Sequence, residues 1–329
     1  MPTFAHAFDW VRRHVDDGPL PTAVLGVATA DGVVALDAFG VEGGRPTAVD
    51  DHYPLFSVTK PIVGLAALRL IEEGRLTPET ALSTAVPEFG AGRDDVVRLR
   101  HLVSHTSGIV EPPLDTPDGL RPSLLAPGRD FAAGTMSRYS TIAFEGIAAL
   151  IERASGESWE QAVAAVGARV GATGLTADAS ASLHEVADAA EQGLDYAQFA
   201  ALRHPGAGLL GRAEDLLAIG SAMLAGGGPL LSPAGYDAML RPLTAGLPKL
   251  EPYPEARGQD WGFTWNLRRA APGLLARDTF GHGGWAGSEF WITPSRGVCF
   301  ALLTNVGGGF GRYGVDADEL HNAVVAAAA

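Results

Sequence analysis

The feature that most constrains the fold is the separation of strand-type and helix-type segments along the 329 residues. Residues 22–29 and 33–39 are apolar runs joined by the short Ala30-Asp31-Gly32 connection, a pattern typical of a β-hairpin. Strand patterns return only near the other end of the chain, at residues 262–267, 289–293 and 297–305. The two ends of the chain are therefore predicted to share one sheet.

Helical spacing of apolar residues dominates the middle of the chain. The predicted helices cover residues 4–15, 61–73, 142–154, 159–168, 213–224 and 316–328. This order predicts an α/β (α+β) fold in which an antiparallel sheet flanked by helices is built from both termini and carries a mostly helical inserted domain. The expected division is a sheet body of residues 1–56 plus 255–329 and a mainly helical domain of residues 57–254, with the 61–73 helix at the boundary.

Charge and cysteine content exclude several classes of partner and site. The chain has 24 basic and 38 acidic residues, a net charge of −14, and no basic patch, so nucleic acid is not expected as a partner. A single cysteine, Cys299, excludes an internal disulfide framework and any multi-cysteine metal site. His101 and His105 are four residues apart, but Leu102 stands where a zinc-peptidase helix needs glutamate, so no metal site is expected.

The sequence also predicts where the protein is found. No apolar run approaches the length of about 18 residues that spans a bilayer, so no membrane association is expected. The N-terminal sequence MPTFAHAFDW lacks the basic region of a secretory signal. We therefore expect a cytoplasmic protein, or a secreted one if a leader has been removed.

The motif Ser57-Val58-Thr59-Lys60, directly before the 61–73 helix, indicates nucleophilic catalysis. Positions i and i+3 lie on one face of a helix, so the lysine amine can reach the serine hydroxyl. Burial favours a neutral lysine, which could then accept the Ser57 proton in the Ser–Lys variant of serine catalysis. The alternative is a serine that caps the helix beside an exposed first-turn lysine. The four residues alone do not decide between these interpretations.

The segments around this motif extend the pattern over most of the chain. They resemble the serine beta-lactamase and penicillin-binding-protein-like superfamily on its class C side, which includes family VIII esterases and D-aminopeptidases. The segments that carry the resemblance are residues 55–61 (LFSVTKP), 101–109 (HLVSHTSGI), 139–141 (YST), 206–231 (GAGLLGRAEDLLAIGSAMLAGGGPLL) and 281–287 (GHGGWAG).

The resemblance implies roles for individual residues. Ser57 would be the nucleophile, Lys60 its activating base and Tyr139 a second acid or base. The oxyanion hole would use the backbone N–H groups of Ser57 and Trp285. No metal and no organic cofactor are implied. Tyr139 as an ordinary half-buried tyrosine is the remaining alternative for that position.

The resemblance also implies a substrate-binding set made of Thr141, His282, Gly283 and Gly284. Two of these depart from the family pattern. Thr141 replaces an asparagine, and a hydroxyl offers fewer hydrogen bonds than an amide. His282 replaces a lysine that meets the substrate carboxylate in lactamases, and a neutral imidazole binds a carboxylate weakly. For His282, a purely structural role is the alternative.

Together these features predict a serine hydrolase that forms an acyl-enzyme on Ser57, most simply a carboxylesterase acting on small acyl esters. The alternatives are a D-amino-acid amidase or peptidase, a weak beta-lactamase, or a catalytically silent member that only binds its ligand. The expected partner is a small-molecule ester or amide. We expect the pocket between the sheet body and the helical insertion, with the Pro-rich loops of residues 111–128 and 246–258 as its rims. The sequence does not indicate the acyl group, the leaving group or the oligomeric state.

Overall fold

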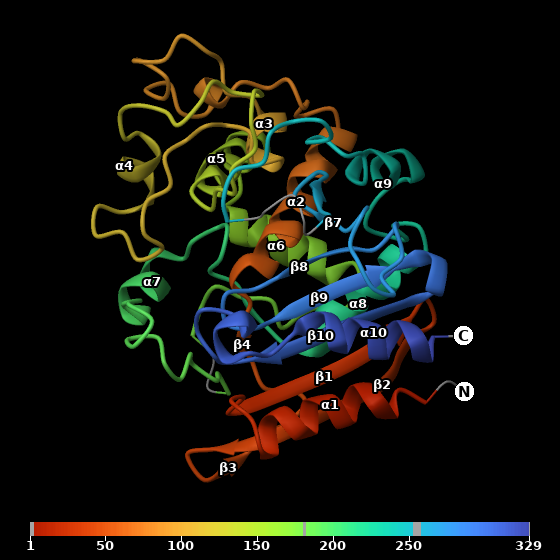
Figure 1. Cartoon of the computed structure of the whole chain (residues 1–329). Helices are drawn as coiled ribbons and strands as arrows, with labels where there is room; N and C mark the ends of the chain where they lie inside the picture. The colour runs from red at the N-terminus through yellow and green to blue at the C-terminus, as the bar shows by residue number, and fades with distance from the viewer. Residues whose placement is uncertain (1–2, 180–181, 253–257, 329) are drawn as a thin grey trace.

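The computed structural model describes residues 3–179, 182–252 and 258–328. Within these residues the main element is an eight-stranded antiparallel sheet of order β3-β2-β1-β10-β9-β8-β7-β6 (Figure 1). Its strands are β1 (Thr22–Thr29), β2 (Gly32–Glu42), β3 (Arg45–Pro46), β6 (Asp260–Trp261), β7 (Asn266–Leu267), β8 (Phe280–Gly283), β9 (Glu289–Thr293) and β10 (Val298–Thr304). N-terminal β1 pairs directly with C-terminal β10, which confirms the antiparallel sheet built from both ends of the chain.

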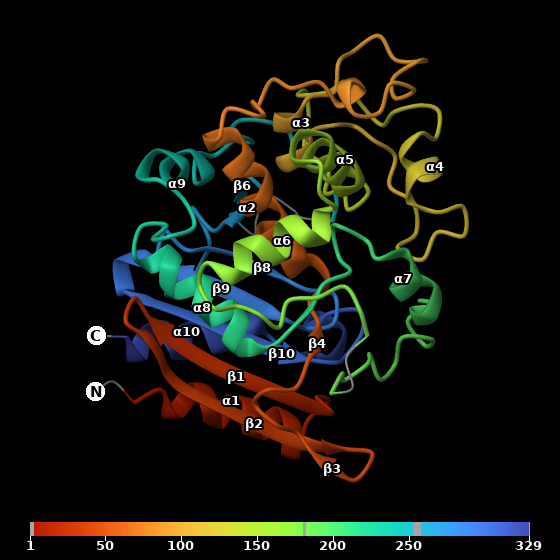
Figure 2. The same cartoon turned by 180° about the vertical axis from the view of Figure 1, so that it is seen from behind.

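Helices cover both faces of this sheet. Helices α1 (Ala5–Asp16) and α10 (Ala317–Ala327) lie on one face, and α8 (Ala213–Leu224) lies on the other (Figures 1 and 2). Successive strand residues point to opposite faces. Leu25 and Val27 accordingly pack in the cluster with α1 and α10, whereas Val24 and Ala28 pack in the cluster with α8. Burial on both faces explains why β1 and β10 are almost continuously apolar.

Two glycines allow α8 to approach the sheet closely. A Cβ atom added to Gly26 on β1 would lie 2.4 Å from a methyl carbon of Leu217. A Cβ atom added to Gly220 on α8 would lie 2.5 Å from the Cys299 sulfur. Cys299 is buried at this contact, as the sequence predicted.

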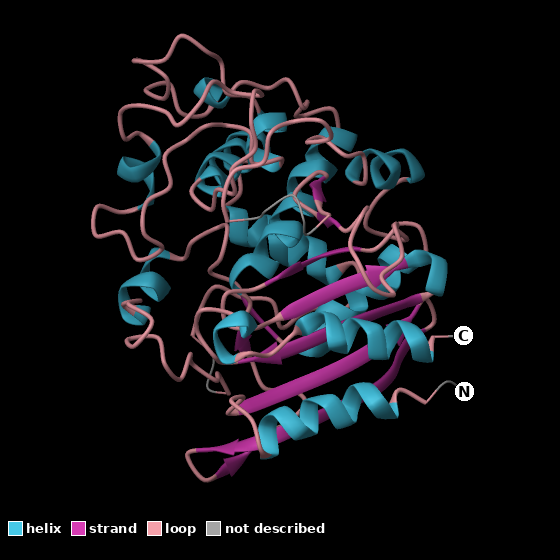
Figure 3. Cartoon of the chain, in the orientation of Figure 1, coloured by secondary structure: helices cyan, strands magenta, loops and turns pink. Residues whose placement is uncertain are grey.

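The remaining helices form a helix-rich part of the molecule beside the sheet (Figure 3), and α2, α5 and α6 share one hydrophobic core with it. Its centre is α2 (Thr59–Glu72), whose side chains are buried over most of its length. The other α-helices are α3 (Leu99–Val103), α4 (Leu120–Leu124), α5 (Ala143–Ser155), α6 (Trp159–Ala168), α7 (Tyr196–Leu202) and α9 (Pro233–Met239). A two-stranded sheet, β4 (Tyr53–Pro54) with β5 (Leu210–Gly211), joins the two parts. Short 3-10 helices cover Phe56–Val58 (η1), Leu82–Thr84, Pro294–Arg296 and Phe310–Tyr313.

The predicted helices and most predicted strands are confirmed within about two residues. The predicted continuous strand at residues 262–267 is wrong. The chain reverses there between β6 and β7, with Gly262 N–H donating to Trp265 O at 2.9 Å and Thr264 at φ 66°. The reversal lets Thr264 N–H donate to Val103 O at 2.9 Å, a tertiary contact that the apolar pattern does not encode.

Strand β8 was not predicted. Its sequence, Phe280-Gly281-His282-Gly283, contains two glycines, and glycine is depleted in strands. Pairing with β7 and β9 on both sides holds it in the sheet. The division into residues 1–56 plus 255–329 and 57–254 stays a prediction, since its second boundary lies outside the described residues. Helix α8 belongs to the 57–254 range but packs on the sheet.

Candidate active site

Ser57 lies where the two parts of the molecule meet, in the 3-10 turn η1 between β4 and α2. Leu55 N–H donates to Leu209 O at 2.9 Å, which fixes the start of this turn. The next residue, Phe56, has a φ of 43°, a conformation that costs a non-glycine residue of order 1–3 kcal/mol. Its buried ring stacks on Phe199 with centroids 4.8 Å apart, and this packing holds the strained backbone that presents Ser57.

Lys60 is fully buried on the first turn of α2. Its Nζ lies 3.0 Å from Ser57 Oγ, 3.3 Å from Thr141 Oγ1 and 2.8 Å from Gly206 O. The helix cap is Val58, with no side-chain capping bond. The alternative of a capping serine beside an exposed lysine is therefore wrong. Burial lowers the pKa of Lys60 to about 7, against an opposing effect of Glu111.

Tyr139 lies against Lys60, as its predicted role requires. The Lys60 Nζ is 4.6 Å from the centre of the Tyr139 ring, and the Tyr139 hydroxyl is 3.4 Å from His282 Nε2. The ring also packs against His105 and Trp261, with centroids 4.5 and 5.4 Å apart. The structure thus brings Tyr139 next to both Lys60 and His282.

His282 is buried on β8, and its Nδ1 lies 2.7 Å from Gly283 O. Burial, together with the neighbouring Lys60, lowers the pKa of His282 to about 3. Two further histidines close to Lys60 behave alike, because burial lowers the pKa of His204 to about 3 and that of His105 well below its ordinary range. A neutral imidazole at position 282 gives a substrate carboxylate no cationic partner.

The backbone after β8 packs against the segment that carries Ser57. A Cβ atom on Gly284 would lie 2.6 Å from Leu55 O, so the two segments touch only because this position is glycine. Gly284 N–H donates to Ser288 O at 2.6 Å, and Gly309 N–H donates to Trp285 O at 3.0 Å. The Trp285 ring lies 5.1 Å from that of Phe56. These contacts place the Trp285 backbone beside the Ser57 turn.

The sequence analysis did not identify four residues that lie around Lys60, Tyr139 and Thr141: Glu111, His204, Gly206 and Trp261. Gly206 supplies a carbonyl to Lys60, and the Glu111 carboxylate accepts from the backbone N–H groups at the start of α5. Glu111 comes two residues after the end of the HLVSHTSGI segment, in Ile109-Val110-Glu111-Pro112. An acidic residue so close to an apolar segment was the sequence feature that could have pointed to Glu111. Nothing in the sequence singled out a carbonyl oxygen.

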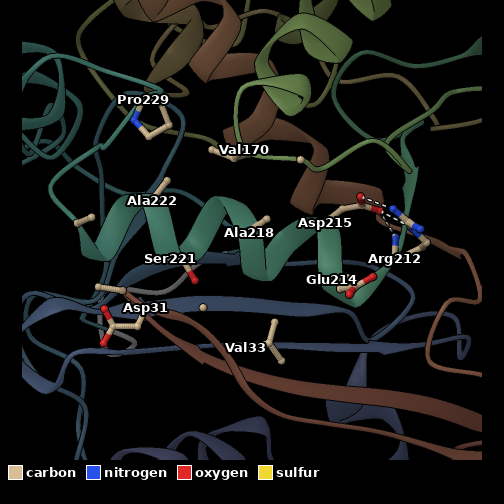
Figure 4. A pocket seen from close by; sticks show the side chains of 14 residues that line it. Asp31, Val33, Val170, Arg212, Glu214, Asp215, Ala218, Ser221, Ala222 and Pro229 are labelled. Atoms are coloured by element: carbon tan, nitrogen blue, oxygen red, sulfur yellow. Dashed lines mark hydrogen bonds and ion pairs between the residues drawn. The ribbon is translucent and has the colours of Figure 1, made fainter.

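The size of a hollow does not by itself mark the site. A groove of about 540 Å³ lies between α8 and the β1–β2 turn, and Asp31, Val33 and Ser221 are among its lining residues (Figure 4). Among its lining residues, Arg212 and Asp215 form an ion pair with each other, with Arg212 Nη2 3.0 Å from Asp215 Oδ1 (Figure 4). None of the residues around Ser57 lines it.

Two features of the described residues concern the binding of a metal ion and the crossing of a membrane. Residues 3–179, 182–252 and 258–328 contain no group of three or more His, Cys, Asp or Glu side chains arranged to hold a metal ion. In the same ranges, each helix is too short or too polar to cross a bilayer.

Comparison with known proteins assigns the family. A family model described as Beta-lactamase matches residues 8–324. The chain is 30% identical over 322 residues to Esterase EstB of Burkholderia gladioli, with 80% of each protein covered. Among solved structures, a penicillin-binding protein homolog from Caulobacter crescentus has a TM-score of 0.80 at 23% identity, covering 98% of this chain and 96% of its own. A family VIII carboxylesterase has a TM-score of 0.78 at 23% identity, covering 99% and 98%. The chain therefore belongs to the beta-lactamase family and is a serine hydrolase.

Proposed function

We propose that this serine hydrolase is a carboxylesterase that acts on small, uncharged acyl esters through an acyl-enzyme on Ser57. The observation that carries the proposal is the contact between Ser57 Oγ and the fully buried Lys60 Nζ at 3.0 Å. A lysine whose pKa lies near 7 is neutral in a large fraction of molecules at neutral pH, so its amine is free to accept a proton. The likeness to Esterase EstB and to the family VIII carboxylesterase supports an ester substrate.

In the proposed mechanism these residues act in the following order. Ser57 Oγ bonds to the ester carbonyl carbon as its proton passes to Lys60 Nζ, and the backbone N–H groups of Ser57 and Trp285 stabilise the oxyanion. The carbon–alkoxide bond then breaks, and the alkoxide leaves with the proton held by Lys60, relayed through Tyr139. Water attacks the acyl-enzyme, Lys60 takes one of its protons and returns it to Ser57 Oγ, and the carboxylic acid leaves.

Two residues favour esters over amides and β-lactams. The neutral His282 offers no charge to the carboxylate that β-lactams and peptides carry. Thr141 gives Lys60 one hydroxyl at 3.3 Å, whereas an asparagine there would both accept from the lysine and donate to a substrate carbonyl. An ester has the better leaving group and needs less help from such contacts.

The pH dependence of ester hydrolysis tests the role of Lys60. Because neutral Lys60 is the base, kcat/KM for p-nitrophenyl acetate is expected to rise about tenfold per pH unit below the Lys60 pKa of about 7 and to level off above it. His282, with a pKa of about 3, does not titrate in this range. Steady-state rates between pH 5 and 9, corrected for hydrolysis without enzyme, measure the profile. A constant kcat/KM from pH 6 to 8 would contradict Lys60 as the base.

Replacing Thr141 by asparagine tests the basis of the ester preference. The wild-type protein is expected to hydrolyse p-nitrophenyl acetate at least about 100-fold faster, in kcat/KM, than a chromogenic cephalosporin or a D-alanyl amide. Thr141→Asn is expected to raise the cephalosporin-to-ester ratio about tenfold, the effect of one added hydrogen bond at a charged site. Thr135→Asn, an exposed threonine in the preceding loop, is the matched control. Cephalosporin turnover that equals the ester in the wild-type protein would contradict the esterase proposal.

A further inference from the structure

Glu111 contacts the segment that carries Tyr139 and Thr141. Its two carboxylate oxygens both accept from Thr141 N–H at 2.9 Å, and both accept from Ile142 N–H at 3.3 Å. The side chain keeps exposed surface, but it is the carboxylate oxygens, turned toward the protein, that make these bonds. Glu111 comes from the loop after α3, so it ties that loop to the start of α5.

These bonds fix the backbone at a point where a helix has unsatisfied groups. The first N–H groups of an α-helix lack partners within the helix, and a negative charge is favourable beside them. Helix α5 begins at Ala143, so Thr141 and Ile142 are the two residues that lead into it. Holding their backbone also holds the Thr141 hydroxyl at 3.3 Å from Lys60 and the Tyr139 ring over the amine.

Burial lowers the pKa of Lys60, and among the described residues the Glu111 carboxylate is the acid whose negative charge opposes this effect by raising that pKa. In turn, partial removal from water raises the pKa of Glu111, while its hydrogen bonds and Lys60 lower it. The other titratable groups that face Lys60 are Tyr139, His105, His204 and His282. The three histidines are neutral at working pH, so Glu111 is the group whose charge can balance that of Lys60.

We propose that Glu111 is a positioning residue: its carboxylate holds the backbone of Thr141 and Ile142, and through it keeps Tyr139 and Thr141 against Lys60, where its negative charge balances that of the amine. The inference rests on the proposed function for its kinetic meaning. Its effect on Lys60 is a property of the folded protein and does not depend on turnover.

The chain has only two lysines, Lys60 and Lys249, so the proton state of Lys60 is directly measurable. Lysine labelled with ¹³C at Cε gives two side-chain NMR signals, and Lys249→Arg identifies the second. We expect Glu111→Gln to lower the titration midpoint of Lys60 by about 0.5 to 1 pH unit, because the opposite charge is removed. The control is Glu145→Gln, a first-turn carboxylate of α5 that pairs with Arg121 at 2.9 Å, and it is expected to leave the midpoint unchanged. A Lys60 midpoint that is the same in Glu111→Gln and wild type would overturn the inference.

Kinetics separate the two parts of the role. Glutamine keeps an oxygen that accepts hydrogen bonds, so Glu111→Gln is expected to keep kcat within about threefold while the acid limb of kcat/KM moves to lower pH with the Lys60 midpoint. Glu111→Ala leaves two N–H groups without this partner and is expected to lower kcat about 10- to 100-fold, the scale of a small misplacement of catalytic groups. Wild-type kcat in Glu111→Ala would overturn the positioning role. If Glu111→Ala does not fold, the NMR titration midpoint of Lys60 in Glu111→Gln still tests the effect of Glu111 on Lys60. Absence of ester turnover in the wild-type protein would count against the proposed function, whereas an unmoved Lys60 midpoint counts against Glu111 alone.

Discussion

Replacing Ser57 by alanine is expected to lower ester hydrolysis about 10³-fold or more, with the fold intact. The physical reason is that Ser57 Oγ is the atom that bonds to the substrate, and it lies 3.0 Å from the Lys60 amine that takes its proton. A fluorophosphonate should therefore modify the wild-type protein once, on Ser57. Intact mass followed by peptide mapping measures the adduct, and stopped-time assays with p-nitrophenyl acetate measure the rate.

The matched control is Ser155→Ala at the end of α5, whose hydroxyl donates only to main-chain carbonyls, those of Ile151 and Glu157. It is expected to keep both the adduct and the activity. A folded wild-type protein that takes no adduct, or an adduct that persists in Ser57→Ala, would rule out Ser57 as the nucleophile. The second outcome would direct attention to another activated hydroxyl.

Replacing Lys60 by methionine is expected to separate activity from stability. Without the base, kcat should fall by about 10²- to 10⁴-fold, the usual contribution of general base catalysis. Methionine fills a similar volume and carries no charge, so the free energy of unfolding at pH 7 should equal or exceed that of the wild type. Activity that is lost together with stability would indicate that Lys60 serves the fold rather than the chemistry.

The sign of the stability effect follows from the pKa of Lys60. Burial lowers the pKa of Lys60 from the ordinary value of 10.5 to about 7. Between about pH 7 and pH 10.5, Lys60 is therefore mostly protonated in the unfolded chain and mostly neutral in the native state. The resulting penalty on the wild type develops as the pH falls from about 10.5 to about 7. The stability advantage of Lys60→Met should therefore be present at pH 7 and shrink toward pH 10, as urea denaturation at both pH values would measure. Arg69→Met, another basic residue of α2, which lies near Glu73 at 3.6 Å, is the control and should keep its activity.

How far the sequence predicts the fold depends on where each signal resides. The hairpin of β1 and β2, helices α6 and α8, and strand β9 follow from periodicity and turn residues, which are local. Strand β8 and the reversal at Thr264 do not, because pairing partners on both sides and a contact with Val103 hold them. The strand or helix propensity of a segment does not depend on pairing strands or contacts that are distant along the chain, so it cannot predict them.

The candidate site divides in the same way. The spacing of Ser57 and Lys60 is a property of one turn of helix, so the sequence predicted their contact as one of two interpretations. The burial of Lys60 in the folded protein excluded the other, a capping serine beside an exposed lysine. The departures at Thr141 and His282 were likewise visible in the sequence as changes of residue type. The neutrality of His282 was expected from ordinary imidazole chemistry, but its cause, burial beside Lys60 on a strand that was not predicted, is a tertiary fact.

The sequence by itself thus determined the sheet made from both ends of the chain, the helical insertion and the spacing that lets Lys60 reach Ser57. These features depend on apolar periodicity and on short spacings, both of which are properties of residues that are close together in the sequence. Only the tertiary structure decided that Lys60 is buried, that Gly206 offers it a carbonyl and that Glu111 reaches the start of α5 from another loop. The pKa of a group depends on all the dipoles and charges around it in space, and these come from segments that fold together only once the whole core has formed.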